Sequence, residues 1–132
     1  MPIENVRMSQ TGRDQLLVLK RRTHIENWNV LCRWAYCLSL AESSHPRNQP
    51  IPSDSSVEMT WRTFGGKEDG IYAALAEAST EGEQNPDKIP EGDFFRLHLH
   101  RGVGYLAGDP NVKSITGLIK LALDRDPNQK DA

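Results

Sequence analysis

The sequence has few of the features that mark secreted, membrane-spanning or zinc-binding proteins. Its two cysteines, Cys32 and Cys37, are too few for a disulfide scaffold, and none of the four histidines stands at a zinc-finger spacing from them. The longest mostly apolar run, residues 30–41, is 12 residues long, whereas a helix needs about 20 residues to span a bilayer. Residues 1–7 contain no apolar segment of signal-peptide type. We therefore expect a cytoplasmic protein whose two cysteines are reduced and buried.

Motifs that bind nucleotides or supply an activated nucleophile are also missing. Residues 65–67 (Gly-Gly-Lys) lack the first spaced glycine of a P-loop, and Glu68 stands where that motif needs Ser or Thr. Gly102 and Gly104 follow a helical pattern, whereas the dinucleotide-binding fingerprint follows a strand. The serines beside Asp54 lack a G-x-S-x-G context. The sequence gives no reason to expect a cofactor.

The length and composition fit one ordinary globular domain. The chain has 132 residues, of which 26% are charged and 37% apolar, and a domain commonly contains about 150 residues. We expect a single domain over residues 1–132 that ends in a loose polar tail over residues 124–132.

The charges are unevenly distributed, although the net charge is only -2. Residues 1–40 hold six basic and three acidic side chains, a net charge of +3, and residues 94–123 hold four and one, also +3. Between them, residues 77–93 hold one basic and six acidic side chains, a net charge of -5. A polyanionic partner fits this pattern if the two basic segments share a face; the alternative is an ordinary scatter of charge.

Hydrophobic periodicity predicts a mostly α fold that begins like a ribbon-helix-helix protein: a short N-terminal strand, two helices, then a further strand or loop and about three helices. Strands are expected over residues 2–8 and 57–64. Helices are expected over residues 11–22, 26–42, 68–79, 94–106 and 114–123. Loops are expected over residues 43–56 and 80–92.

The first strand has a clear inner and outer face. Val6 and Met8 point one way, and Asn5 and Arg7 point the other way. So short a strand must pair with another, either later in this chain or in a second copy. In β-ribbon DNA-binding proteins, strands from two chains pair and enter a groove, and Asn5 and Arg7 would then face the DNA. The start of the second helix, near residues 27–29, is a further candidate for a phosphate contact.

The sequence also contains signals for the starts of the first two helices. Ser9 or Thr11 is a suitable N-cap for the first helix. One stripe of this helix carries Leu16, Leu19 and Thr23. The second helix has two candidate starts, a capping box formed by Thr23 and Glu26, and an N-cap at Asn27.

The second helix is apolar on nearly every side, which predicts that it is buried nearly all round. A chain of this size cannot easily cover it alone, so we expect an oligomer. Arg33 lies within this helix, and an unpaired buried charge is very unfavourable. We expect Arg33 to form an ion pair, within the chain or across a subunit boundary, and the alternative is a contact with a phosphate.

Within the sequence, the stretch most similar to a set of catalytic side chains is residues 98–101 (His-Leu-His-Arg). On a helix, residues two apart point in different directions, so only one of His98 and His100 could join a given site. A capping or packing role is the favoured interpretation. Metal-dependent nuclease chemistry would need clustered carboxylates. The candidates are Asp54, Glu58, Glu68 and Asp69, which have no diagnostic spacing.

Several runs of the sequence are long and unusual in composition. They are Leu19-Lys20-Arg21-Arg22-Thr23, residues 27–35, residues 51–61, Thr63-Phe64-Gly65-Gly66, residues 95–102 and residues 104–106. With these motifs the chain resembles, over about residues 7–123, the DndE family of bacterial DNA phosphorothioation systems. Those systems replace a non-bridging oxygen of the DNA backbone with sulfur.

The resemblance implies a small accessory protein of this restriction-modification-type machinery. The resemblance further implies a homotetramer that binds DNA through surface lysines and prefers nicked duplex, while partner proteins mobilise and transfer the sulfur. The matching basic cluster here is Lys20-Arg21-Arg22, and arginine also binds phosphate well.

We therefore expect a non-catalytic, DNA-binding subunit without a metal or cofactor, which works with other proteins of the phosphorothioation system. The candidate DNA contacts are Arg7, Arg13, Lys20, Arg21, Arg22 and Arg101. One alternative is a metal-dependent nicking nuclease. The other is an assembly scaffold that docks partner proteins through acidic residues 77–93.

Overall fold

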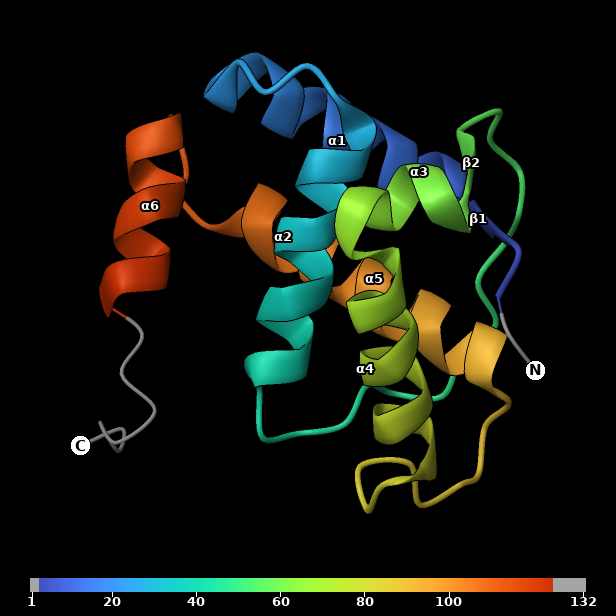
Figure 1. The fold of residues 1–132 in the computed structure, drawn as a ribbon. Coiled ribbons are helices and arrows are strands. Elements are labelled where there is room, and N and C mark those ends of the chain that lie inside the picture. Colours follow the sequence, from blue (N-terminus) through green and yellow to red (C-terminus); the bar gives the residue numbers. More distant parts are fainter. Residues whose placement is uncertain (1–2, 125–132) are drawn as a thin grey trace.

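The computed structural model describes residues 3–124 and is mainly helical (Figure 1). In chain order the elements are β1 (Asn5–Arg7), α1 (Gln10–Thr23), α2 (Trp28–Ala41), β2 (Glu58–Thr60), α3 (Trp61–Gly65), the 3-10 turn η1 (Gly66–Glu68), α4 (Asp69–Glu81), α5 (Glu91–Gly108) and α6 (Ile115–Asp124). The expected order of a strand, two helices, a second strand and further helices is confirmed. Most of the expected tail over residues 124–132 lies outside the described residues.

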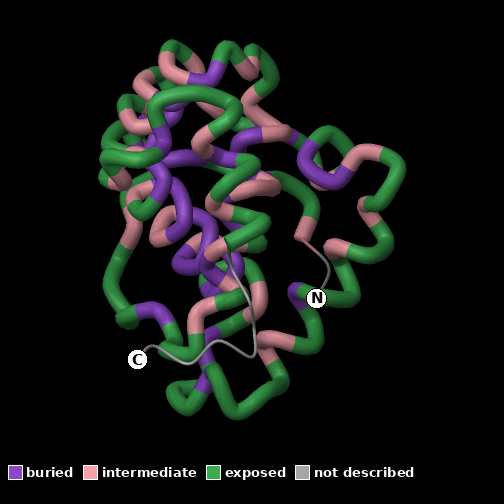
Figure 2. The backbone as a smooth tube through the Cα atoms, turned by 90° about the vertical axis from the view of Figure 1, so that its left-hand side faces the viewer, coloured by how far each residue is buried: buried purple, intermediate pink, exposed green. Residues whose placement is uncertain are grey.

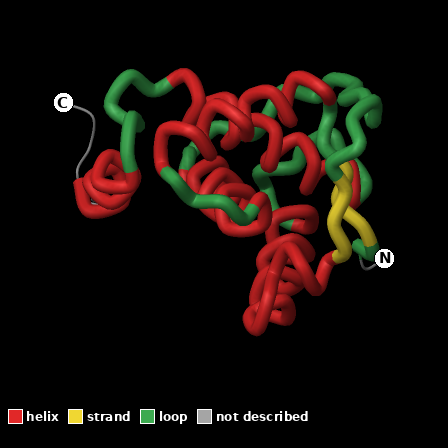
Figure 3. Tube along the Cα trace, turned by 90° about the horizontal axis from the view of Figure 1, so that it is seen from above, coloured by secondary structure: helices red, strands yellow, loops and turns green. Residues whose placement is uncertain are grey.

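The two short strands pair with each other in an antiparallel sheet. Val6 lies opposite Met59, and both are buried, whereas Asn5 and Arg7 are exposed as predicted. A backbone hydrogen bond from Met8 N–H to Val57 O, 2.9 Å, extends the pairing. The first strand was expected to pair either later in this chain or with a second copy, and the structure shows the pairing within the same chain. Figure 3 shows the two strands (yellow) on the opposite side of the molecule from α6.

The second strand is shorter than the predicted strand over residues 57–64, which was wrong beyond Thr60. The hydroxyl of Thr60 accepts a hydrogen bond from Thr63 N–H at 3.1 Å and thereby caps α3. The alternation of apolar residues continued through Trp61, but this side chain instead packs at the start of a helical turn, with its ring centroid 5.1 Å from that of Phe64. Local capping therefore ended the strand early.

Helix α1 begins where the sequence predicts and buries the predicted stripe. Ser9 is the N-cap, and its hydroxyl accepts a hydrogen bond from Gly12 N–H at 3.0 Å. The capping box proposed for Thr23 and Glu26 was wrong, because Thr23 ends α1. Its hydroxyl donates to Leu19 O at 2.8 Å, and α2 begins after Asn27 instead.

The core forms where α2 packs against α5. Gly102 permits this close approach, since a Cβ atom on it would lie 1.8 Å from the carbonyl oxygen of Ala35. Tyr36 continues the contact on the same helix, with its ring centroid 4.6 Å from that of Phe95. Figure 2 shows the buried positions (purple) running through the middle of the molecule, with mostly exposed loops (green) around them. No helix within residues 3–124 combines the length and apolarity of a membrane span.

Candidate nucleic-acid interface

The three cations that end α1 lie on different sides of the helix. Residues two apart on a helix are separated by about 200°, and the contacts of Lys20 and Arg22 agree with that separation. The Lys20 ammonium lies 5.1 Å from the ring centroid of Trp28, at the start of α2. Nη1 of Arg22 donates to Ala107 O, at the end of α5, at 2.9 Å. Arg21 lies between them and is exposed, so the cluster surrounds the end of α1 rather than forming one flat patch.

Arg13 lies beside the start of α2, seven residues before Lys20 and thus on the same side of α1. It lines a groove of about 460 Å³ together with Trp28, Asn29 and other residues of that helix start. Two carboxylates, of Glu26 and Glu58, line the same groove. The phosphate site expected at residues 27–29 is therefore a groove of mixed charge.

Arg7 is engaged within its own sheet. Its Nε donates to Oε2 of Glu58, its register partner on β2, at 2.7 Å. Arg13 makes the other ion pair within residues 3–124, with Asp14 at 3.7 Å. Of the six candidate DNA contacts, these two therefore already have a carboxylate partner.

Arg101 connects the end of α2 to the loop that follows it. Its Nε donates to the Ser39 hydroxyl at 2.8 Å, and its Nη2 donates to the carbonyl oxygens of Ser39 at 2.8 Å and Ser44 at 3.0 Å. Its Nη1 donates to the Ser44 hydroxyl at 3.2 Å. All four acceptors are neutral, so these contacts orient the guanidinium without neutralising its charge.

Arg96, five residues earlier on α5, holds the middle of the same loop. Its guanidinium donates to the carbonyl oxygens of Ile51 at 3.0 Å, Pro52 at 2.9 Å and Arg7 at 3.1 Å. Burial lowers the pKa of Arg96. No local signal in the sequence identifies Arg96, because its partners lie more than 40 positions away in the chain.

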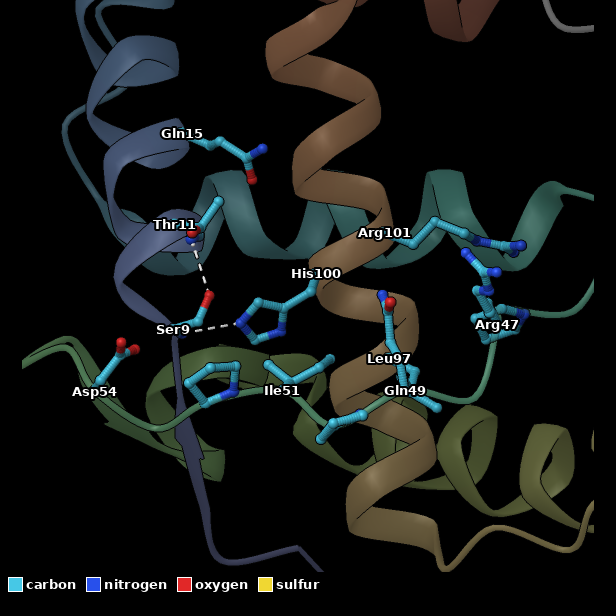
Figure 4. Close-up of a pocket in the computed structure, with 14 residues that line it drawn as sticks. Ser9, Thr11, Gln15, Arg47, Gln49, Ile51, Asp54, Leu97, His100 and Arg101 are labelled. Atoms are coloured by element: carbon cyan, nitrogen blue, oxygen red, sulfur yellow. Dashed lines mark hydrogen bonds between the residues drawn. The ribbon is translucent and has the colours of Figure 1, made fainter.

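The loop fixed by these arginines forms one wall of a cleft of about 390 Å³ (Figure 4). The other walls come from the start of α1 and the middle of α5. Arg47 and Arg101 lie at one end of the cleft, and Asp54 lies at the other end. The Asp54 carboxylate accepts a hydrogen bond from Gln10 N–H at 2.8 Å and so helps to cap α1.

His100 lines this cleft and joins α5 to the start of α1. Its Nδ1 lies 2.9 Å from Arg96 O, and its Nε2 accepts a hydrogen bond from Ser9 N–H at 3.0 Å. These partners require a proton on Nδ1 only, so the ring is neutral. Burial lowers the pKa of His100 to about 4. The predicted capping role of a histidine in residues 98–101 is confirmed here.

His98 faces a different part of the interior, as its spacing from His100 predicts. It is 3% exposed, packs edge-on against Phe94, and places Nδ1 2.8 Å from the Ser39 hydroxyl. Burial, reinforced by the nearby charge of Arg101, lowers the pKa of His98 to about 4. This residue is a packing histidine.

The carboxylates considered for a nuclease site do not come together. Asp54 lines the cleft, whereas Glu58 pairs with Arg7 and lines the groove at the start of α2. Glu68 and Asp69 lie farther along the chain, where η1 meets α4. In the part of the chain that the structure describes, no group of three or more His, Cys, Asp or Glu side chains is placed to hold a metal ion.

Arg33 and the cysteines differ from expectation in two respects. Nη1 of Arg33 donates to Phe64 O at 2.7 Å, so its partner is a carbonyl group rather than the expected carboxylate. Cys32 is buried as predicted, and burial raises its pKa to about 12. Cys37 is exposed on the outer side of α2, where the prediction of a buried thiol was wrong.

The outer side of α2 is apolar and only partly covered. Trp34, Cys37, Leu38 and Ala41 line a shallow hollow of about 160 Å³ with residues of α5 and α6. On α6, which contributes to this hollow, Ile119 is 47% exposed. We call these four α2 residues together with Ile119 the apolar surface. The apolar composition of α2 predicted that one side of this helix would be incompletely covered, and the apolar surface is that side.

Two comparisons with known proteins bear on this arrangement. No individual curated protein sequence matches the chain. Residues 5–114 match the family model described as DndE, DNA sulphur modification protein DndE. This match covers the sheet, the end of α1, Arg96 and Arg101, and all the residues that line the cleft. The chain therefore belongs to the DndE family of DNA sulfur modification proteins.

Proposed function

We propose that this protein is a non-catalytic, DNA-binding subunit of the DNA sulfur modification machinery and that it prefers nicked duplex. One structural observation carries the DNA-binding part. Lys20, Arg21 and Arg22 form no ion pair with any carboxylate of residues 3–124, whereas Arg7 and Arg13 do. The three cations lie in the last turn of α1, at the top edge of Figure 1, where Arg21 is exposed and Lys20 and Arg22 are half-buried. Unpaired cations on a protruding helix end suit the phosphates of a nucleic-acid backbone.

We further propose that the protein works as a homo-oligomer, a tetramer in keeping with the family resemblance. The apolar surface supports this step, because a second copy would remove its exposed side chains from water. Oligomerisation would also place several copies of the α1 cations on one particle, so that one duplex could contact more than one basic cluster.

The preference for nicked duplex rests on the family resemblance, and a titration tests it. The full-length protein is titrated against intact and nicked duplex of one sequence at two salt concentrations, with fluorescence anisotropy as the readout. We expect tighter binding to the nicked duplex, and a decrease of log K with log salt of about 0.9 for each phosphate contacted.

Two variants connect this binding to α1. The triple variant K20A/R21A/R22A is expected to lower the salt slope by up to about 2.7, corresponding to three phosphates at about 0.9 each. Because Arg22 also contacts Ala107, the exposed Arg21→Ala is tested alone, with an expected decrease of about 0.9. Lys113→Ala, an exposed cation elsewhere, is the matched control. An unchanged slope in both α1 variants would count against the proposal.

The non-catalytic part has its own test. Supercoiled plasmid is incubated with the purified protein and Mg²⁺ or Mn²⁺, and we expect no conversion to relaxed circles above a protein-free control. Relaxed circles whose yield follows the amount of protein, and decreases in an Asp54→Asn variant, would favour the nuclease alternative instead.

A further inference from the structure

We propose that Arg47 and Arg101 form a phosphate-binding site at one end of the cleft between the 42–57 loop and α5. The site deepens the proposed function if the phosphate belongs to DNA, and it lies on the opposite side of α1 from Lys20. Figure 4 shows the two side chains, one from the loop and one from the helix, pointing toward each other at the same end of the cleft.

The two guanidinium groups have no counter-charge within the described residues. Neither Arg47 nor Arg101 forms an ion pair with a carboxylate within residues 3–124. The one carboxylate lining this cleft, that of Asp54, lies at the far end and already accepts the Gln10 N–H. Two guanidinium groups that face each other repel, and they repel more strongly beside a protein wall than in bulk water. An anion between them would replace this repulsion with two attractive contacts.

Arg101 is held in position for a contact with an anion. Its bonds to Ser39 and Ser44 fix the guanidinium plane, and Tyr105 lies against it with 5.6 Å from Cζ to the ring centroid. A guanidinium has five N–H groups. Arg101 uses four of them on these neutral oxygens, so one N–H of Nη1 and the whole positive charge remain for a ligand.

The other polar side chains that line this cleft also suit a phosphate group. Arg47 is exposed and makes no hydrogen bond to another described residue, so its planar fork is available for a bidentate contact. The amides of Gln15 and Gln49 line the same cleft and add neutral donors. Charged guanidinium forks with neutral amide donors fit a phosphate group. That phosphate could come from the DNA backbone or from free inorganic phosphate, and the test separates the two sources.

The test uses Arg47→Ala in the full-length protein, because replacing Arg101 would also release Ser39 and Ser44. Arg62→Ala removes the same charge from an exposed position on α3 that does not line the cleft, and serves as the control. Binding of nicked duplex is measured against salt, and binding of inorganic phosphate is measured by isothermal titration. For DNA we expect Arg47→Ala to lower the salt slope by about 0.9, which corresponds to about eightfold weaker binding at 0.1 M salt.

Each outcome has a defined meaning. A lower DNA salt slope, found in Arg47→Ala but not in Arg62→Ala, assigns the site to the DNA backbone. Loss of inorganic phosphate binding with an unchanged DNA slope assigns the site to free phosphate. If neither changes, the site does not exist. If the α1 triple variant then still loses DNA binding, the proposed function stands while this inference falls.

Discussion

The backbone N–H of Ser9 donates a hydrogen bond to Nε2 of His100 at 3.0 Å and joins the start of α1 to the middle of α5. The same ring is bonded through Nδ1 to Arg96 O, 2.9 Å away. Arg96 in turn holds the loop at Ile51 and Pro52. One neutral histidine thus connects the α1 start to the arginine that fixes one wall of the cleft.

The neutral state of the buried histidines predicts how the stability of the protein depends on pH. The pKa values of His98 and His100 are about 4 in the folded protein, against about 6.5 for a histidine in an unfolded chain. Between these values the unfolded state binds more protons, so stability decreases as the pH falls from 6.5 toward 4. We expect each histidine to remove about 2 kcal/mol from the free energy of unfolding between pH 7 and pH 5.

Urea denaturation of the wild type at pH 7 and pH 5 measures this loss. His100→Gln removes one titrating ring, so its stability should change less between the two pH values. His45→Gln, at an exposed position, should leave the wild-type difference intact. An identical pH difference in His100→Gln and the wild type would show that this ring does not titrate as inferred.

Close packing between α2 and α5 predicts the effect of adding one methyl group. Gly102→Ala would place Cβ 1.8 Å from Ala35 O, so the helices must separate. We expect a loss of about 3 kcal/mol or more of unfolding free energy. Gly92→Ala, in the first turn of the same helix and open to solvent, should be neutral or slightly stabilising, by up to about 1 kcal/mol. Thermal unfolding compares the two, and equal melting temperatures would contradict the close contact.

Arg96 holds the 42–57 loop, so replacing it should change the sensitivity of this loop to proteases. Arg96→Gln removes the donors to Ile51 O and Pro52 O, so the loop should open more often. Trypsin cleaves after Arg47 in this loop, and we expect faster cleavage there in the variant than in the wild type. Mass spectrometry of early fragments measures the rate, with Arg62→Gln as the control. Unchanged cleavage after Arg47 would mean that other contacts hold the loop.

The apolar surface predicts the position of a subunit contact. We expect Leu38→Asp and Ile119→Asp to lower the solution mass of the protein, because a carboxylate buried between copies is strongly unfavourable. Leu17→Asp introduces the same charge at an exposed leucine of α1, outside the apolar surface, and should leave the mass unchanged. Sedimentation equilibrium measures the three masses. A wild-type mass for both Leu38→Asp and Ile119→Asp would place the contact elsewhere.

Local signals in the sequence predicted much of the fold correctly. Ser9 was one of two predicted N-caps, with Thr11, because a cap depends on a residue only three positions away, and alternation alone predicted one common side for Val6 and Met8, which are both buried. The errors lie where two local signals compete. Thr23 fits a capping box but ends the preceding helix, and Trp61 continues an alternation but follows the cap formed by Thr60.

The candidate site was predicted less completely, because charge in a sequence does not show which cations are already paired. Arg7 and Arg101 have the same formal charge. The structure gives Arg7 the Glu58 carboxylate, 51 positions away, and gives Arg101 only neutral serine oxygens. No signal in the sequence marks Arg47, which lies in a proline-containing loop, as a binding residue. It is a candidate only because the fold places it opposite Arg101.

The sequence by itself determined the helix-rich fold, the family, the inward side of the first strand and the apolarity of α2. These follow from periodicity, capping and motifs, whose physical causes act within a few neighbouring residues. Only the tertiary structure decided the strand pairing, the neutral state of His100, and the position of Arg47 opposite Arg101. Those outcomes depend on groups that lie far apart in the chain and meet only when the strands, α1, α5 and the 42–57 loop pack together.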